Sequence, residues 1–172
     1  MPRKKREEPE FKKKDIRKIK DSEWSEFEDY YIEKVNEIEV PEDLEARDIL
    51  IINSEIDEVY AEARFDYGFA KAQLQRWEQK LSNAKKSSKL IFKKGAGQTN
   101  EDRDALIITF LESNTLKGDP EPLFVLVDRW SERALFMEAV VDNLLKKSDK
   151  MVNGNGALKL DAQGRGEFGK GR

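Results

Sequence analysis

The fold of this chain is decided by one proline-free run, LEARDILIINSEIDEVYAEARFDYGFAKAQLQRWEQKLSNAKKSSKLIFKK, residues 44–94. Apolar residues recur along it at steps of three and four, which is the spacing of one face of an α-helix. A helix of about 50 residues is about 75 Å long, whereas a compact domain of this size has a radius of gyration of about 15 Å. The run therefore predicts a long helix that pairs along its length with another helix. Ser88 interrupts its apolar stripe and Ile91 resumes it; the other positions are Ile52, Ile56, Val59, Ala63, Tyr67, Ala70, Leu74, Trp77, Leu81 and Ala84.

Two further helices are predicted on the carboxyl side of the run, over residues 101–113 and about 121–151. Thr99 with Asp102 resembles a capping box before the first of them. Asp119 supplies a side-chain cap, followed by a first-turn proline, before the second. No strand alternation of useful length appears in the sequence. We therefore expect an all-α fold, an elongated antiparallel helical hairpin in which the long helix packs against these two.

The flanks of the hairpin differ from it in composition. Residues 1–21 form a basic arm, which we expect to be flexible because few apolar residues interrupt its charges. Residues 22–152 form the helical hairpin and oligomerisation domain. Residues 153–172 hold six of the chain's ten glycines and predict a flexible tail. A two-helix hairpin cannot bury apolar residues that lie off the main stripes, so we expect a homo-oligomer; these residues are Ile49, Phe65, Phe69, Leu135 and Phe136.

The composition argues against enzymatic chemistry. The chain has no histidine and no cysteine, which removes the commonest general base, thiol nucleophiles and the usual zinc ligands. No phosphate-binding loop, dinucleotide fingerprint or calcium loop occurs, so we expect no enzyme, cofactor or metal site. No apolar run approaches the roughly 18–20 residues of a membrane span, and no secretory signal is present. A cytoplasmic protein without a membrane partner is expected.

Charge is distributed unevenly along the sequence. Residues 1–20 carry a net charge of +6, residues 21–84 a net charge of −12 and residues 85–172 a net charge of +3, which together make the formal −3 of the chain. Such asymmetry is typical of a polyanion-binding end attached to an acidic body. The same charges also permit contacts between the basic end of one subunit and the acidic body of another.

The lysine-rich turn at the tip of the predicted hairpin is the candidate binding site. Five lysines and one aromatic residue gather there, a combination that neutralises phosphates and offers a ring on which a base can stack. Ser87 and Ser88 add hydroxyl donors. The alternative interpretation is a solvated helix end, where lysines favour the negative end of the helix dipole. The predicted single-strand-binding residues are Lys85, Lys86, Lys89, Phe92, Lys93 and Lys94.

The order of these features resembles the UvsY-like recombination mediators of bacteriophages. The matching stretches are IDEVYAEARFDYGFAKAQLQRWEQKLSNAKKSSKLIFKK (56–94), TNEDRDALIITFLESN (99–114) and RWSERALFMEAVVDNLLKKSDKM (129–151). The resemblance rests on helical pattern and order over about residues 56–151. It implies a helical oligomer that binds single-stranded DNA through the tip lysines, and that helps a recombinase to displace single-strand-binding protein. The acidic body of this chain departs from that expectation.

The resemblance implies an accessory protein of DNA recombination and repair. It would be a homo-oligomer whose partners are single-stranded DNA, a recombinase and single-strand-binding protein, and for a phage-encoded chain it would act in the host cytoplasm. The alternative is a phage structural, scaffolding or adaptor protein that uses its helical stripes for self-association and binds no nucleic acid. Strong DNA binding at moderate salt separates the two.

Overall fold

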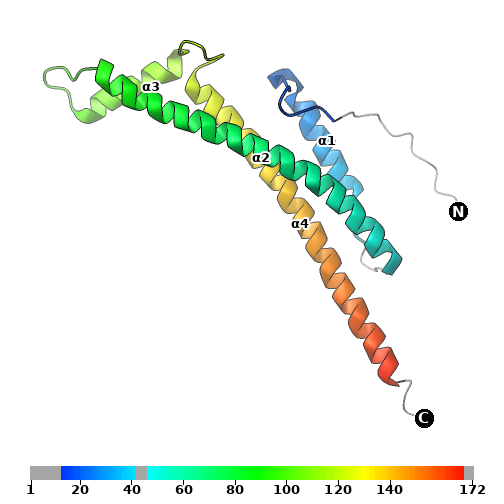
Figure 1. The fold of residues 1–172 in the computed structure, drawn as a ribbon. Coiled ribbons are helices and arrows are strands. Elements are labelled where there is room, and N and C mark those ends of the chain that lie inside the picture. Colours follow the sequence, from blue (N-terminus) through cyan, green and yellow to red (C-terminus); the bar gives the residue numbers. More distant parts are fainter. Residues whose placement is uncertain (1–12, 42–45, 169–172) are drawn as a thin grey trace. The chain divides into compact units, whose positions relative to one another are not determined.

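The structure, a computed structural model, describes the backbone of residues 13–41 and 46–168 and the side chains of residues 13–41 and 48–154. A 3₁₀ turn at Asp21–Glu23 leads into four α-helices (Figure 1), which are α1 (Trp24–Glu37), α2 (Ala46–Ile91), α3 (Asn100–Ser113) and α4 (Leu123–Phe168). No strand occurs among these residues. The predicted all-α class is therefore confirmed.

The chain divides into two compact units. Unit 1 takes in the chain up to Ala63 and again from Asp142 onward, and unit 2 comprises Arg64–Val141. Helices α2 and α4 each contribute one part to both units. The hairpin arrangement of the whole chain stays a prediction.

Unit 1 has a core built from α1 and its neighbours. The aromatic residues Phe27 and Tyr31 of α1 are almost fully buried, as are Ile56 of α2 and Leu144 of α4. Ile16 is also buried, at 1% exposed, so the described part of the predicted basic arm is packed rather than free. Neighbouring carboxylates pair with its lysines: Lys13 with Glu62, and Lys14 with Glu23 and Glu26. Residues 1–12 of the predicted arm lie outside the described residues.

Unit 2 has a separate apolar cluster made by three helices. Its buried members are Leu81 of α2, Ile107 and Leu111 of α3, and Leu123 and Leu126 of α4. Ile107 and Leu111 are four residues apart, so they lie on the same face of α3. This face fixes α3 against α2 and α4, and it positions the residues of the candidate site.

The apolar stripe of α2 faces inward over most of its length, as the periodicity predicts. Ile52, Ile56, Ala63, Ala70 and Leu81 are all buried, but Ile91, predicted to resume the stripe after Ser88, is 76% exposed because α2 ends there. The helix itself spans Ala46–Ile91, close to the predicted 44–94. None of the described helices has the length and apolar character needed to cross a membrane.

Helix α4 differs from its prediction at both ends. It begins at Leu123 rather than at residue 121, because Pro122 disfavours the helical conformation at the residue before it. Asp119 is therefore not its cap; the Asp119 side chain is 1% exposed and ion-paired with Lys80 of α2. At the other end α4 continues to Phe168, beyond the predicted end near residue 151. Each glycine in this extension weakens a helix by roughly 1 kcal/mol without forbidding helical geometry; the predicted flexibility of the tail stays a prediction.

Candidate nucleic-acid interface

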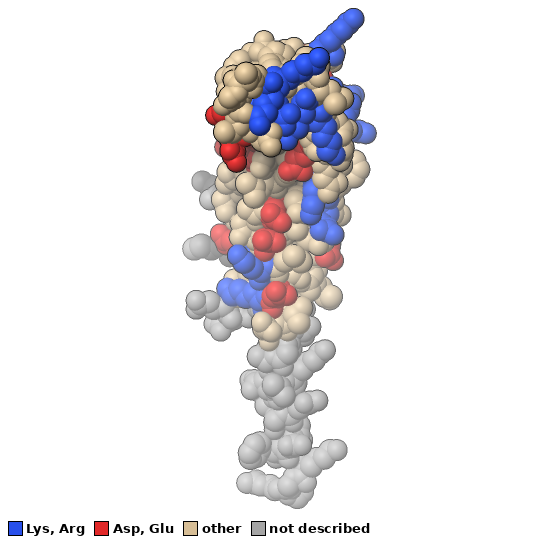
Figure 2. Space-filling view, turned by 90° about the vertical axis from the view of Figure 1, so that its left-hand side faces the viewer, with Lys and Arg blue, Asp and Glu red and all other residues tan. Residues whose placement is uncertain are grey.

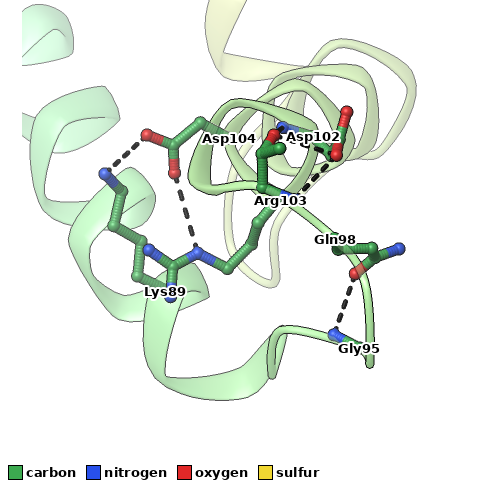
Figure 3. Close-up of polar contacts among 7 residues, drawn as sticks. Lys89, Gly95, Gln98, Asp102, Arg103 and Asp104 are labelled. Atoms are coloured by element: carbon green, nitrogen blue, oxygen red, sulfur yellow. Dashed lines mark hydrogen bonds and ion pairs between the residues drawn. The ribbon is translucent and has the colours of Figure 1, made fainter.

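The connection between α2 and α3 is a compact turn held by two hydrogen bonds between Gly95 and Gln98. The Gly95 N–H donates to Gln98 Oε1 at 2.9 Å, and the Gln98 N–H donates to the Gly95 carbonyl at 3.2 Å (Figure 3). Gly97 has a φ of +82°, in the left-handed region that glycine adopts without steric cost. The turn brings the start of α3 back toward the last turns of α2.

The predicted capping box at the start of α3 is confirmed. The Asp102 N–H donates to Thr99 Oγ1 at 3.1 Å, and the Thr99 N–H and hydroxyl donate to Asp102 Oδ2 at 2.8 and 2.9 Å. The two donors on Thr99, the backbone N–H first and then the hydroxyl, lower the pKa of Asp102 from its ordinary value. The cap determines where α3 begins, whereas the buried face of Ile107 and Leu111 determines which of its residues face α2.

A groove of about 250 Å³ lies between α2 and α3, within unit 2. Lysines of α2 form one wall, apolar residues of α3 form the floor, and one carboxylate of α3 faces the lysines. Figure 2 views the molecule from the side on which the α2–α3 turn lies in Figure 1. Lys and Arg side chains gather near the top of this face. The lining residues are Ser82, Lys85, Lys86, Lys89, Asp104, Ile107 and Ile108.

Two of the predicted lysines are already engaged by the protein. Lys89 reaches from α2 to Asp104 of α3, with Nζ 2.9 Å from Oδ2 (Figure 3). Lys85 Nζ lies 4.8 Å from the centroid of the Phe124 ring, a cation–π contact that holds the lysine beside the groove without neutralising it. Both side chains line the groove, and both keep N–H donors for a ligand.

The three other predicted lysines are exposed. Lys86 lines the groove, while Lys93 and Lys94 follow the end of α2. None of the three has an ion pair with another residue in the described part of the chain. These are the lysines that a phosphate reaches without displacing a carboxylate.

The aromatic and hydroxyl residues of the predicted site are less accessible than the lysines. Phe92 is half-buried, packs against the unit 2 cluster and lies 5.3 Å from the Phe110 ring, measured between centroids. Ser88 is buried on the inward stripe of α2, whereas Ser87 is exposed. Only the exposed part of the Phe92 ring is therefore available for stacking on a base.

The acidic partner in the groove, Asp104, was not predicted. Its Oδ1 lies 3.8 Å from Nε of Arg103; both atoms are buried, with no hydrogen-bond partner among the described residues. Asp104 thus faces two cations but makes a short contact with only one. The available signal was helical spacing, because Asp104 lies three residues before the buried Ile107 and therefore on the same side of α3.

The groove offers cations and apolar surface to a ligand. No group of three or more carboxylates that could hold a metal ion occurs in the described part of the chain. A flexible anion with apolar parts matches this lining, since ammonium groups bind its charge and Ile107 with Ile108 bind its apolar surface. No protein-family model matches the chain, and no curated protein or solved structure does either.

Proposed function

We propose that this protein binds single-stranded DNA through the lysine groove between α2 and α3. The observation that carries the proposal is the juxtaposition of Lys85, Lys86 and Lys89 with two isoleucines of α3 in one groove. The exposed Lys93 and Lys94 follow in the chain, just after the end of α2. Single-strand sites combine backbone neutralisation with surfaces for exposed bases. Contacts of this kind go to phosphate, so binding is largely independent of sequence and strongly dependent on salt.

The proposal includes assembly into a homo-oligomer that loads a recombinase, as the resemblance to UvsY-like mediators implies. Helix α3 supports self-association, because Leu106 and Phe110 remain exposed on it while Ile107 and Leu111 are buried. Leu90 and Ile91 of α2 are also exposed, at 82% and 76%. A ring or array of subunits would turn a few weak lysine contacts into useful affinity through effective concentration.

The elongated antiparallel hairpin belongs to the same proposal. Within unit 2, the hydroxyl of Tyr67 lies 3.0 Å from Glu138, and the ring of Phe69 packs edge-on against Trp130. Lys80 pairs with Asp119 further along. As the residue number rises along α2, from 67 to 69 to 80, the number of its partner falls from 138 to 130 to 119. This is the order expected of antiparallel helices.

The test of DNA binding is the double variant Lys93→Glu/Lys94→Glu. Each single-strand phosphate contact contributes about 0.7 to the slope of log affinity against log salt, so losing two contacts lowers the slope by about 1.4. At about 0.1 M salt this corresponds to roughly 25-fold weaker binding. Fluorescence anisotropy with labelled single-stranded and duplex oligonucleotides across a salt series measures both quantities.

The matched control is Lys71→Glu/Lys117→Glu, which makes the same charge change at exposed lysines of unit 2 outside the groove. Circular dichroism and light scattering on the same samples check helicity and assembly. Equal affinity in the two double variants removes the end of the groove from the DNA site. Preference for duplex over single strands argues against the proposed function itself.

A scaffold or adaptor role is the second candidate, and the exposed apolar residues of α3 and of the end of α2 favour it. In that role Leu106 and Phe110 dock another copy or another structural protein, and the lysines are only a solvated helix end. The Lys89–Asp104 pair also fits this role, because it neutralises one of the cations. A well-folded oligomer that binds no single-stranded DNA at low salt is the result expected from a scaffold.

A further inference from the structure

A second lysine-lined pocket lies in unit 1 and shares no residue with the DNA interface proposed above. It has a volume of about 460 Å³ and lies between the carboxyl end of α1 and the part of α4 in that unit. This volume is within the range of about 300–1,000 Å³ usual for small-molecule sites. The lining residues are Val35, Asn36, Val40, Asn143, Lys146, Lys147 and Lys150.

Two of the three lysines are held in place by backbone carbonyls. Lys147 Nζ donates to the carbonyl of Ile38, the residue that caps α1, at 2.5 Å. Lys150 Nζ donates to the Val40 carbonyl at 3.2 Å. An ammonium group has three N–H donors, so each of these lysines keeps donors for a ligand after binding its carbonyl. The contacts orient the side chains without neutralising their charge.

Helical spacing places the cationic residues of α4 on one face. Asn143, Lys146, Lys147 and Lys150 lie on this face because successive residues turn by about 100°. Asp142 and Asp149 lie on one flank of it, four residues before and three residues after Lys146, and do not line the pocket. None of the described residues that line the pocket is acidic.

Negative charge among the groups that line the pocket comes from the backbone at the end of α1. Helix α1 ends there, and the negative end of its dipole amounts to about half an elementary charge. The three ammonium groups of Lys146, Lys147 and Lys150 exceed it several-fold. The amides of Asn36 and Asn143 add neutral donors, so the pocket offers a multiply charged anion both cations and hydrogen bonds.

We propose that this pocket binds an anion carrying at least two phosphate charges. The shared chemistry is phosphate, supplied either by a free diphosphate-bearing compound or by adjacent phosphates of a nucleic-acid strand. The site is separate from the α2–α3 groove and does not depend on the function proposed for that groove. Val35 and Val40 add apolar contact beside the phosphates.

Isothermal titration calorimetry of the full chain with inorganic pyrophosphate at low salt tests the site. Wild type binds, and Lys146→Ala weakens binding by about tenfold or more, because the variant loses a hydrogen bond to a charged group. Asn143→Asp also weakens it, since an acceptor carboxylate replaces an amide donor at nearly the same volume. Both side chains are exposed, so we expect neither substitution to disturb the fold. Circular dichroism checks that each variant keeps its helicity.

Two controls separate this site from the groove. Lys117→Ala removes an exposed lysine of unit 2, and Lys93→Glu/Lys94→Glu alters the DNA interface; both leave pyrophosphate binding unchanged. Adding an oligothymidine then identifies the source of phosphate: competition indicates that a strand occupies the pocket, and no competition indicates a free compound. Absence of binding by wild type, or an equal loss in Lys117→Ala and Lys146→Ala, overturns the proposal.

Discussion

The groove of unit 2 and the pocket of unit 1 are each lined by three lysines, but only the groove contains a carboxylate. Lys89 in the groove is paired with Asp104, whereas Lys147 and Lys150 in the pocket donate to neutral carbonyls. A phosphate that enters the groove must therefore exchange with a carboxylate at Lys89. A phosphate that enters the pocket adds to lysines that keep their full charge.

This difference suggests two different uses of lysine. Exchange against Asp104 makes each contact in the groove weak and reversible, which suits a surface that gains affinity from many subunits on one strand. Pre-oriented lysines without a competing acid suit one compact anion per chain, since less side-chain freedom is lost on binding. Three variants in unit 2 test the comparison, beginning with the largest expected effect.

Leu111→Ala removes the apolar support of the groove. Leu111 is 1% exposed in the unit 2 cluster, and truncation of a buried leucine costs about 2–5 kcal/mol of unfolding free energy. Leu106→Ala is the matched control on the same helix, because Leu106 is 50% exposed; its expected change is within about 0.5 kcal/mol. Urea unfolding followed by circular dichroism measures both. Equal stability in the two variants contradicts the packing of α3 described here.

Thr99→Ala weakens the start of α3 without touching the lysines. Loss of a threonine cap costs about 1 kcal/mol of unfolding free energy. The pH dependence has a defined sign: the pKa of Asp102 is lowered in the folded chain, so its contribution is present above the ordinary value and is lost as the pH falls below about 4. Thermal unfolding from neutral pH to about pH 3 should therefore lose less stability in the variant than in wild type. Parallel losses contradict the cap's role.

Asp104→Asn makes the groove resemble the pocket by removing its only lining acid. Lys89 then becomes available to phosphate, which adds up to about 0.7 to the single-strand salt slope and tightens binding at most about fivefold at about 0.1 M salt. Stability should change little, because exposed ion pairs contribute about 0.2–1 kcal/mol. Asp128→Asn, an exposed change outside the groove, is the control in the anisotropy assay. Identical affinities in both variants indicate that Lys89 does not contact the strand.

Much of the helical framework was predictable because its signals are local. The inward stripe of α2 follows from apolar spacing, and the start of α3 follows from the Thr99–Asp102 cap, both of which involve residues within one or two turns. The predicted start of α4, about residue 121, is two residues too early, because Pro122 disfavours the helical conformation at Glu121. Asp119 is an ion-pair partner of Lys80 rather than the cap of α4.

The candidate site was only partly predictable. Lys85, Lys86 and Lys89 share one helix, so sequence spacing alone placed them together, and the charge run marked them as a polyanion-binding candidate. Asp104, Ile107 and Ile108 complete the groove from another helix. The pocket of unit 1 was missed because Lys146, Lys147 and Lys150 become a site only where α1 ends beside them.

The sequence by itself determined the helices, the face that each buries, and the uneven distribution of charge, because these depend on residue spacing and composition within short segments. Only the tertiary structure decided which lysines are paired, which carbonyls orient them, and which carboxylates stand close enough to compete with a phosphate. Those outcomes depend on side chains 15 residues apart in the case of Lys89 and Asp104, and on contacts 109 and 110 residues apart at Lys147 and Lys150. Electrostatic and hydrogen-bond energies fall steeply with distance, so small differences in packing decide them.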